Sequence, residues 1–276
     1  MNSDNTMSGV YYALTAYIFW GVVPVYFKWV DHVSPWEILA HRVIWALILL
    51  MVILAWTRQL NELRIPLRLL PKLLLTSILL ATNWLVFIYA VVNNNIAETA
   101  LGYFINPLVS VFLGVIILRE YLRQLVIFGR VPWIALTLAF SFGFYGLFRK
   151  NLGLHAIGGL AIETMLVVPF AIAFLARSGW RDQLAFGDHL PTDLLLVLGG
   201  FVTSFPLLCF AAAVKRLSLT TMGMFQYVAP SISLALAIFV FAEPFDPGRA
   251  VTLLCIWIAL AIFTFEAWMH HRRRPI

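Results

Sequence analysis

The chain has 276 residues, of which 62% are hydrophobic and only 12% are charged. A soluble domain normally carries about a quarter charged residues, so this composition excludes a soluble fold with one large core. The net charge of +6 does not indicate a nucleic-acid partner, because the basic residues gather in short segments between apolar runs, a pattern typical of membrane orientation.

About nine segments approach the roughly 20 apolar residues that a helix needs to cross a bilayer. We therefore expect an all-α, polytopic membrane protein. In chain order the expected spans are Gly9–Val30, Trp36–Thr57, Pro71–Val92, Ile96–Leu118, Pro132–Phe148, Leu154–Ala176, Asp193–Val214, Leu219–Ala242 and Pro247–Trp268. No positive stretch precedes the first span, so a cleaved signal peptide is not expected. Cys209 and Cys255 fall inside spans and are interpreted as buried free thiols.

Several tryptophans lie at or near the ends of these spans. Such an arrangement indicates a belt of aromatic side chains at the two membrane interfaces. The residues are Trp29, Trp36, Trp56, Trp133, Trp180 and Trp268.

The second half of the chain repeats the first at a nearly fixed offset. At 122 positions the matches are Ala13 with Ala135, Leu14 with Leu136, Thr15 with Thr137, Gly21 with Gly143 and Lys28 with Lys150; at 123 positions they are Pro107 with Pro230, Ser110 with Ser233, Leu113 with Leu236 and Glu120 with Glu243. We predict two repeated helical bundles within one membrane domain, over residues 9–131 and 132–269. Duplicated helical membrane proteins are usually small-molecule transporters.

The basic residues predict the orientation of the first half. Arg58, Arg64, Arg68 and Lys72 follow the second span, so that loop and the N-terminus are expected in the cytoplasm. The second half does not fit this order. Basic pairs and triplets that look cytoplasmic would lie outside if only the expected spans were crossed; they are Arg149–Lys150, Lys215–Arg216 and Arg272–Arg274.

One membrane crossing is therefore missing between Glu120 and Pro132. The second repeat has a fifth span, Pro247–Trp268, and the first repeat has only Tyr121–Val131 in that place. A helix of that length would extend about 17 Å, against a hydrocarbon core of about 30 Å. The first repeat is interpreted as four spans plus a short remnant.

Several stretches together resemble the EamA-type permeases of the drug/metabolite transporter superfamily, in particular the RarD branch. The resemblance covers nearly the whole chain. Its motifs are Glu37–Arg42, Asn83–Ala90, Glu98–Pro107, Ala139–Gly146, Ala161–Thr164 and Gln226–Pro230.

The resemblance implies ten helices with both termini in the cytoplasm. Two inverted repeats of five helices would enclose a central cavity, and access to the cavity would alternate between the two sides. This chain departs from the pattern after Arg119–Arg123, where the family continues into a fifth helix. The departure leaves an inactive deletion variant open as an alternative.

Charged residues inside spans are unfavourable in lipid and indicate function by default. Glu37 and His41 are four residues apart and share one helix face, whereas Arg42 points about 100° away from His41. At the repeat offset His41 aligns with Glu163, and we expect these two positions to face each other across a cavity. Our hypothesis is that Glu163 and His41 handle protons or a substrate amine. Arg42 would hold a substrate anion or brace the helix end. The alternative is a helix-end residue that snorkels or donates hydrogen bonds to carbonyls.

Polar and aromatic residues in the third, fourth and eighth spans complete the candidate site. Amides inside a span need either a neighbouring helix or a wet cavity, and aromatic rings can wall a site for a ligand. Pro107 and Pro230 would interrupt matched helices, which also indicates a binding site. The set is Asn83, Trp84, Tyr89, Tyr103, Asn106, Gln226 and Tyr227. Glu120 and Glu243 are interpreted as solvated helix ends.

The function that fits best is an inner-membrane permease for a small metabolite or drug-like solute, coupled to a proton or to an exchanged solute. We expect no enzyme activity, no cofactor and no metal, since the chain carries no zinc, Walker or nucleophile-elbow motif. The expected partners are the lipid bilayer and a small-molecule substrate, with a homodimer left open. A membrane scaffold or regulatory protein remains the main alternative.

Overall fold

The structure is a computed structural model that describes residues 3–104, 133–150, 152–217 and 219–244. Every regular element in these ranges is a helix, as the sequence predicts. The last expected span and the remnant between Glu120 and Pro132 lie outside the described residues.

Most ends of the helices in the first half lie within a few residues of the expected span ends. These helices are α1 (Ser3–Trp29), α2 (Pro35–Trp56) and α3 (Leu70–Val92), with short 3-10 turns η1 (Leu60–Leu63) and η2 (Leu67–Leu69) between α2 and α3. Residues 96–104 are also helical. Pro35 stands at the first position of α2, where its missing N–H would have no partner in any case.

The second half contains α5 (Trp133–Lys150), α6 (Ala156–Gly179) and α7 (Leu190–Val214), followed by α8 (Leu219–Phe225), α9 (Val228–Ala235) and the π-helical turn η3 (Leu236–Val240). The eighth expected span is therefore interrupted between α8 and α9. Pro230 explains the interruption, because proline lacks an N–H and its ring clashes with the carbonyl four residues earlier, here that of Gln226.

Five of these helices are long and apolar enough to cross a membrane: Thr6–Trp29, Pro35–Trp56, Leu67–Val92, Ala156–Gly179 and Leu190–Val214. Trp133–Gly146 and Val228–Val240 are shorter apolar helices. The chain is thus a multi-pass membrane protein. The described tryptophans at helix ends are exposed, as an interfacial belt requires; they are Trp29, Trp36, Trp56, Trp133 and Trp180.

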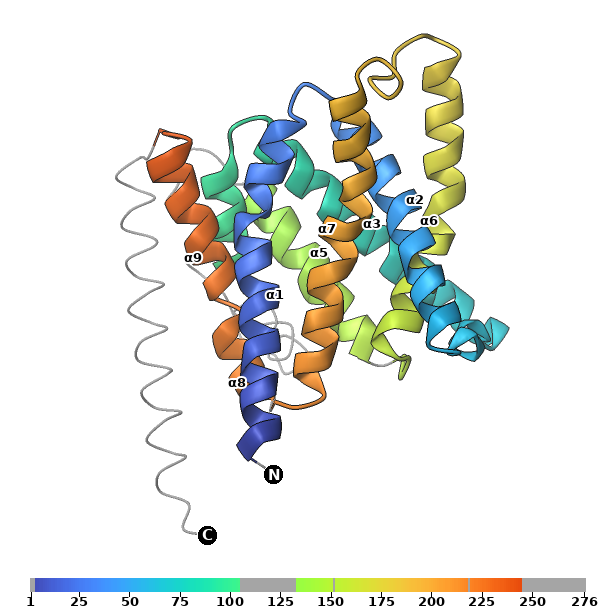
Figure 1. The fold of residues 1–276 in the computed structure, drawn as a ribbon, viewed down its shortest axis with the longest axis vertical. Coiled ribbons are helices and arrows are strands. Elements are labelled where there is room, and N and C mark those ends of the chain that lie inside the picture. The colour runs from blue at the N-terminus through green and yellow to red at the C-terminus, as the bar shows by residue number, and fades with distance from the viewer. Residues whose placement is uncertain (1–2, 105–132, 151, 218, 245–276) are drawn as a thin grey trace, which may run out of the picture.

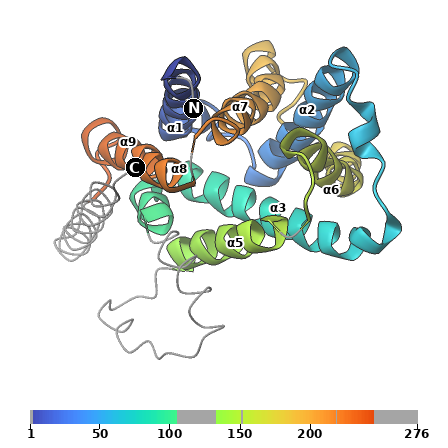
Figure 2. The same ribbon diagram turned by 90° about the horizontal axis from the view of Figure 1, so that it is seen from below.

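Helices from the two halves pack against one another rather than in two separate bundles. α2 packs on α6 and α7, α1 packs on α7 and α9, and α3 packs on α5 and α6. Figure 1 shows α1 and α7 side by side, and Figure 2 shows α3 between α2 and α5. The largest apolar cluster joins the two halves around buried side chains such as Phe27, Ile88 and Leu138.

Two glycines allow especially close helix contacts. A Cβ on Gly200 of α7 would lie 2.5 Å from the carbonyl carbon of Trp45 in α2. A Cβ on Gly102 would lie 2.8 Å from the carbonyl oxygen of Ala135 in α5. Neither distance is compatible with a real side chain, so these positions let the backbones approach, as small residues do in membrane bundles.

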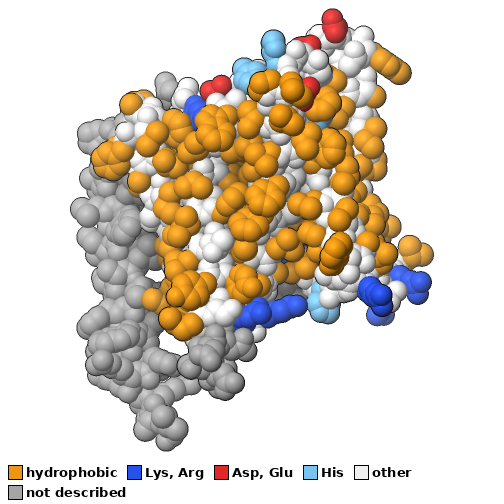
Figure 3. Space-filling view, viewed as in Figure 1, with side chains coloured by type: hydrophobic (Ala, Val, Ile, Leu, Met, Phe, Trp, Pro, Cys, Tyr) orange, Lys and Arg blue, Asp and Glu red, His pale blue; other side chains and the backbone are white. Residues whose placement is uncertain are grey.

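The basic segments of both halves lie at one end of the bundle. The backbone nitrogen of Ile134, at the start of α5, donates to Oε1 of Glu98 at 3.2 Å, so α5 begins beside the start of helical residues 96–104. Its other end, at Arg149, contacts the start of α6, where the nitrogen of Gly158 donates to Glu62 of the η1 turn. In Figure 3 most Lys and Arg side chains gather at the lower rim and most acidic ones at the upper rim.

α5 therefore runs from the end of the bundle at which helical residues 96–104 begin to the end that holds the loop between α2 and α3. The expected conflict in the second half depends on the crossing between Glu120 and Pro132, which lies outside the described residues. Arg149, at the end of α5, lies beside the start of α6, which binds Glu62 in the loop between α2 and α3.

Candidate functional site

Arg42 is directed into the bundle. It belongs to α2, and its Nε donates a hydrogen bond of 2.6 Å to Oγ1 of Thr203 on α7. Only 8% of the residue is exposed. An arginine that snorkels would extend its head to the membrane surface, so this alternative does not describe Arg42.

Aromatic rings cover the guanidinium of Arg42. Its central carbon lies 4.5 Å from the ring centroid of Trp84 on α3 and 5.6 Å from that of Phe27 on α1. Cation–π contacts of this kind stabilise a desolvated cation by about 2 kcal/mol. Four helices from both halves of the chain thus contribute to the surroundings of Arg42.

Asn83 joins three helical segments next to this arginine. Its Nδ2 donates to the carbonyl oxygen of Leu138 at 3.1 Å and to Oγ of Ser141 at 3.0 Å, both on α5. Its Oδ1 accepts a hydrogen bond of 3.2 Å from the hydroxyl of Tyr103. Asn83 is 2% exposed and uses both ends of its amide inside the protein, so these contacts favour interhelical packing over direct ligand binding.

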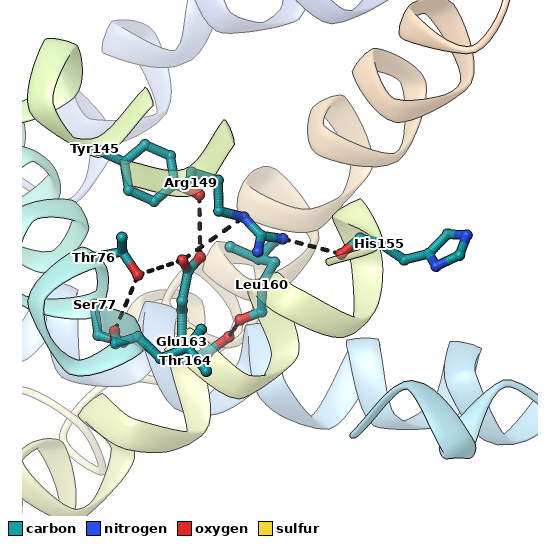
Figure 4. A network of polar contacts seen from close by, with 9 residues as sticks. Thr76, Ser77, Tyr145, Arg149, His155, Leu160, Glu163 and Thr164 are labelled. Carbon is teal, nitrogen blue, oxygen red and sulfur yellow. Dashed lines mark hydrogen bonds and ion pairs between the residues drawn. The ribbon is translucent and has the colours of Figure 1, made fainter. Parts of the chain in front are cut away.

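Glu163 on α6 lies in a separate polar network, shown in Figure 4. Its carboxylate accepts hydrogen bonds from Oγ1 of Thr76 at 2.7 Å and from the hydroxyl of Tyr145 at 3.1 Å. Nε of Arg149 lies 3.7 Å from Oε1 of the same carboxylate. The buried charge of Glu163 is therefore compensated by one cation and two hydroxyl groups.

The network of Glu163 extends to the basic face of the bundle. Nη2 of Arg149 donates to the carbonyl oxygen of His155 at 3.0 Å. Glu62 in η1 accepts a hydrogen bond of 3.2 Å from the nitrogen of Gly158 and lies 3.7 Å from Nδ1 of His155. These contacts connect the end of α5, the start of α6 and the loop before α3.

Sequence reasoning missed Thr76, Tyr145, Arg149 and Glu62 as members of this network. Arg149 was assigned only to a loop cluster of positive charge, and a serine or threonine inside an apolar run carries no positional signal. The alignment of Tyr145 and Arg149 at i and i+4, on one face of a predicted helix, was the one pattern that pointed to shared contacts.

Glu37 and His41 both contact the loop between α6 and α7. The carboxylate of Glu37 accepts hydrogen bonds from the nitrogens of Ala185 and Phe186, at 3.0 and 2.9 Å. The ring of His41 stacks on Phe186 with centroids 4.5 Å apart. The shared helix face expected for Glu37 and His41 is therefore used, and Nε2 of His41 has no hydrogen-bond partner in the described part of the chain.

His41 and Glu163 do not share a site in these contacts. His41 lies with the loop at the acidic face, whereas Glu163 is bound by residues near the basic face. Because α2 and α6 run in opposite directions, equivalent positions near their starts lie toward opposite ends of the bundle. The expectation that His41 and Glu163 face each other across a cavity therefore does not hold, because the directions of the two helices place these residues toward opposite ends.

Four candidate residues remain. Tyr227 stacks on Phe104 with centroids 6.4 Å apart and packs with Leu101 and Ala135. Within the described ranges, the hydrogen bond of Gln226 is the one that its backbone nitrogen donates to the carbonyl oxygen of Met222. Tyr89 is 42% exposed and packs on Trp133. Asn106 lies outside the described residues.

Glu243 is not a solvated helix end. It is 7% exposed, and its two carboxylate oxygens accept hydrogen bonds from the nitrogens of Ile96 and Ala97, at 2.7 and 2.9 Å. The first nitrogens of a helix have no acceptor within it, so Glu243 supplies an acceptor for them from the other half of the chain. The matching Glu120 lies outside the described ranges.

Within the described ranges no three His, Cys, Asp or Glu side chains come together as a set that could hold a metal ion. Cys209 is a buried free thiol, as expected.

Comparison with known proteins gives a consistent assignment. The chain matches the EamA-like transporter family over residues 7–135 and again over 129–265. It is 41% identical to the uncharacterized transporter YojE of Bacillus subtilis, with 96% of each chain covered. It is also 41% identical to protein RarD of Escherichia coli, with 99% of each chain covered. No solved structure matches the chain.

A more distant relative is the chloramphenicol-sensitive protein RarD of Pseudomonas aeruginosa, 27% identical with 94% of each chain covered. The alignment with the Escherichia coli protein runs over 293 positions against the 276 residues of this chain, an excess of 17. At least that many residues of the relative have no counterpart here, a number close to the length of one membrane span.

Proposed function

Because the chain belongs to the EamA-like transporter family, we propose that this membrane transporter moves a small metabolite or drug-like solute across the bacterial inner membrane by alternating access. The observation that carries this proposal is Arg42, a buried cation surrounded by helices from both halves and without a carboxylate partner among the described residues. A buried charge in a membrane bundle marks a substrate or ion pathway.

The helix contacts support two repeats related by a pseudo-two-fold axis. At the repeat offset α1 corresponds to α5, α2 to α6 and α3 to α7. Such an axis exchanges the α1–α7 contact with the α5–α3 contact and maps the α2–α6 contact onto itself, and all three contacts occur. Inverted repeats place the substrate near the middle of the membrane, between the two halves, where Arg42 and Trp84 meet.

The distribution of charge supports a cytoplasmic N-terminus. A Cβ on Gly9, in the first turns of α1, would lie 2.8 Å from Cβ of Arg216, so the start of the chain is at the same end as the basic turn after α7. Cytoplasmic loops carry the excess of Lys and Arg. The face bearing Arg64, Arg149 and Arg216 is therefore the cytoplasmic one.

Proton or exchange coupling is the finer part of the proposal, and Glu163 is its first candidate. The carboxylate is buried and contacts a cation that a proton on the carboxylate would release. The Glu163→Gln substitution keeps the volume and removes the titratable group, so it is expected to abolish any dependence of uptake on pH. Uptake in proteoliposomes at two external pH values measures this, and an unchanged dependence would remove Glu163 from the coupling mechanism.

Alternating access can be tested without knowing the solute. In a Cys209→Ala, Cys255→Ala background, Thr203→Cys places one thiol beside Arg42. A membrane-impermeant maleimide should label it in both right-side-out and inside-out vesicles. Asp188→Cys and His155→Cys, at the two opposite faces, report the sidedness of each vesicle preparation. Labelling of the Thr203→Cys protein from one side only, or from neither, would contradict alternating access.

The alternative of a scaffold or inactive deletion variant rests on the residues that the relatives have and this chain lacks. Flux separates the cases, since a carrier saturates with solute and a scaffold gives none. Competition between stereoisomers separates a carrier from a passive pore.

A further inference from the structure

Among the residues that the structure describes, Arg42 has no oppositely charged partner. Among the described residues the ion pairs are Arg149 with Glu163 and His155 with Glu62, and neither involves Arg42. Removing a cation from water without pairing it is strongly unfavourable. The aromatic rings of Trp84 and Phe27 offset only part of that cost. The arrangement therefore favours an anion that comes from outside the described chain.

The hydrogen bonds of Arg42 determine which of its edges is free. Its Nε donates to Oγ1 of Thr203, and the same hydroxyl donates at 2.8 Å to the carbonyl oxygen of Gly199. Thr203 thus acts as an acceptor toward the arginine and fixes the direction of the guanidinium. Among the described residues, the hydrogen bond of the Arg42 guanidinium is the one from Nε, so neither Nη group has a partner there.

The geometry of the free edge specifies the shape of the ligand. Trp84 and Phe27 cover the guanidinium, and Nε is occupied. What remains is the end formed by the two Nη groups, which is a planar fork. Such a fork binds the two oxygens of one carboxylate through parallel hydrogen bonds, and a lysine ammonium cannot reproduce it.

The acids of the bundle argue against a positively charged or zwitterionic ligand. Glu37 and Glu243 are occupied by backbone nitrogens, and Glu163 by Arg149 and two hydroxyls. None of these buried carboxylates is left to receive a substrate ammonium next to Arg42. Because Arg42 is a single cation with no free carboxylate beside it, it matches a ligand with a single negative charge.

Resting on the proposed transport function, we propose that the solute is an organic monoanion whose carboxylate binds end-on to the two Nη groups of Arg42. Its apolar body would lie against the aromatic side chains around the arginine, which include Trp84 and Tyr103. Thr203 is a positioning residue that holds the guanidinium in the orientation needed for this bidentate contact.

Equilibrium binding to the purified full-length protein in lipid nanodiscs tests the proposal. The probes are acetate, hexanoate and phenylacetate, each compared with its neutral amide, and phenethylammonium as a cation. At least one carboxylate should bind saturably and at least tenfold more tightly than its amide. Failure of all three carboxylates to bind, or equal binding of acid and amide, would overturn the proposal.

Variants at two positions assign the contact. Arg42→Gln and Arg42→Lys should each weaken carboxylate binding at least tenfold and leave the residual binding of the amide unchanged. Thr203→Val should weaken the carboxylate by a few fold, and Thr203→Ser, which keeps the hydroxyl, should restore wild-type binding. Full carboxylate affinity in Arg42→Lys would contradict the fork, and equal weakening in the Val and Ser variants would contradict the positioning role.

Flux in proteoliposomes separates this inference from the proposed function. Saturable flux of an amide or an ammonium ion, without flux or binding of carboxylates, would leave transport standing and remove the anion assignment. Carboxylate binding that depends on Arg42, without flux, would leave the anion site standing and contradict transport.

Discussion

Oε1 of Glu243 accepts a hydrogen bond of 2.7 Å from the backbone nitrogen of Ile96, a residue 147 positions earlier in the chain. Its other oxygen binds the nitrogen of Ala97. A carboxylate of the second half thus completes the start of a helix of the first half, where negative charge is favoured by the helix dipole. The two halves depend on each other for the hydrogen bonds of their helix ends.

Glu243→Ala is expected to destabilise the protein by about 2 kcal/mol, the upper range for loss of a helix cap. Glu243→Gln keeps one acceptor and should cost less. The measurement is the midpoint of thermal unfolding in detergent micelles, with Asp31→Asn as control because Asp31 is exposed and makes none of these contacts. An equal midpoint for all three variants would show that the cap does not contribute to stability.

The pair of Glu163 and Arg149 is expected to be coupled energetically. Glu163→Gln leaves Arg149, whose side chain is only 15% exposed, without its carboxylate, and should destabilise by about 1–3 kcal/mol. The Glu163→Gln, Arg149→Gln double variant should be less destabilised than the sum of the single variants, since residues in one network are not additive. Thermal unfolding of the four proteins gives the coupling, and strict additivity would contradict the ion pair.

Gly200 is expected to tolerate no side chain. The Cβ of Gly200→Ala would overlap the backbone of Trp45, so α2 and α7 would have to separate at a cost of about 1–3 kcal/mol. Gly146→Ala is the matched control, because a Cβ there has nothing within 4 Å, and it should be neutral or stabilising by up to about 1 kcal/mol. Unfolding midpoints measure both, and equal behaviour of the two variants would contradict the close contact.

Single cysteines at the helix connections should report two opposite faces. In the background without Cys209 and Cys255, Arg64→Cys and Lys215→Cys should react with an impermeant maleimide only in inside-out vesicles. Asp31→Cys and Asp188→Cys should react only in right-side-out vesicles. Reaction of Lys215→Cys on the side of Asp31→Cys would mean that the second half is inverted relative to the arrangement described here.

Much of the fold was predictable because each span is a local property. A run of about 20 apolar residues forms a helix in lipid whatever its neighbours are, since its backbone can be satisfied only internally. The bounds of α2 and α3 follow from this, and the interruption before α9 follows from Pro230, whose effect is also local. The number of crossings between Glu120 and Pro132 remains a prediction.

The site was only partly predictable. Composition singled out Arg42, Asn83 and Trp84, because polar and charged residues inside apolar runs stand out, and the structure brings these three together with Tyr103. Composition could not predict Arg149 as the partner of Glu163 or Thr203 as the partner of Arg42, since such pairs depend on which helices pack together. The assignment of His41 and Glu163 to one site was wrong for the same reason.

The amino-acid sequence by itself determined that this protein is a duplicated, all-helical membrane protein and which few ionisable groups must be explained, because the partition of apolar residues into lipid acts on each segment alone. Only the tertiary structure decided that Glu163 is paired with Arg149 and that Arg42 has no carboxylate partner within the described part of the chain. Charge compensation depends on distances of a few ångströms between helices far apart in the chain, and those distances exist only once α2 packs on α7 and α5 packs beside α6.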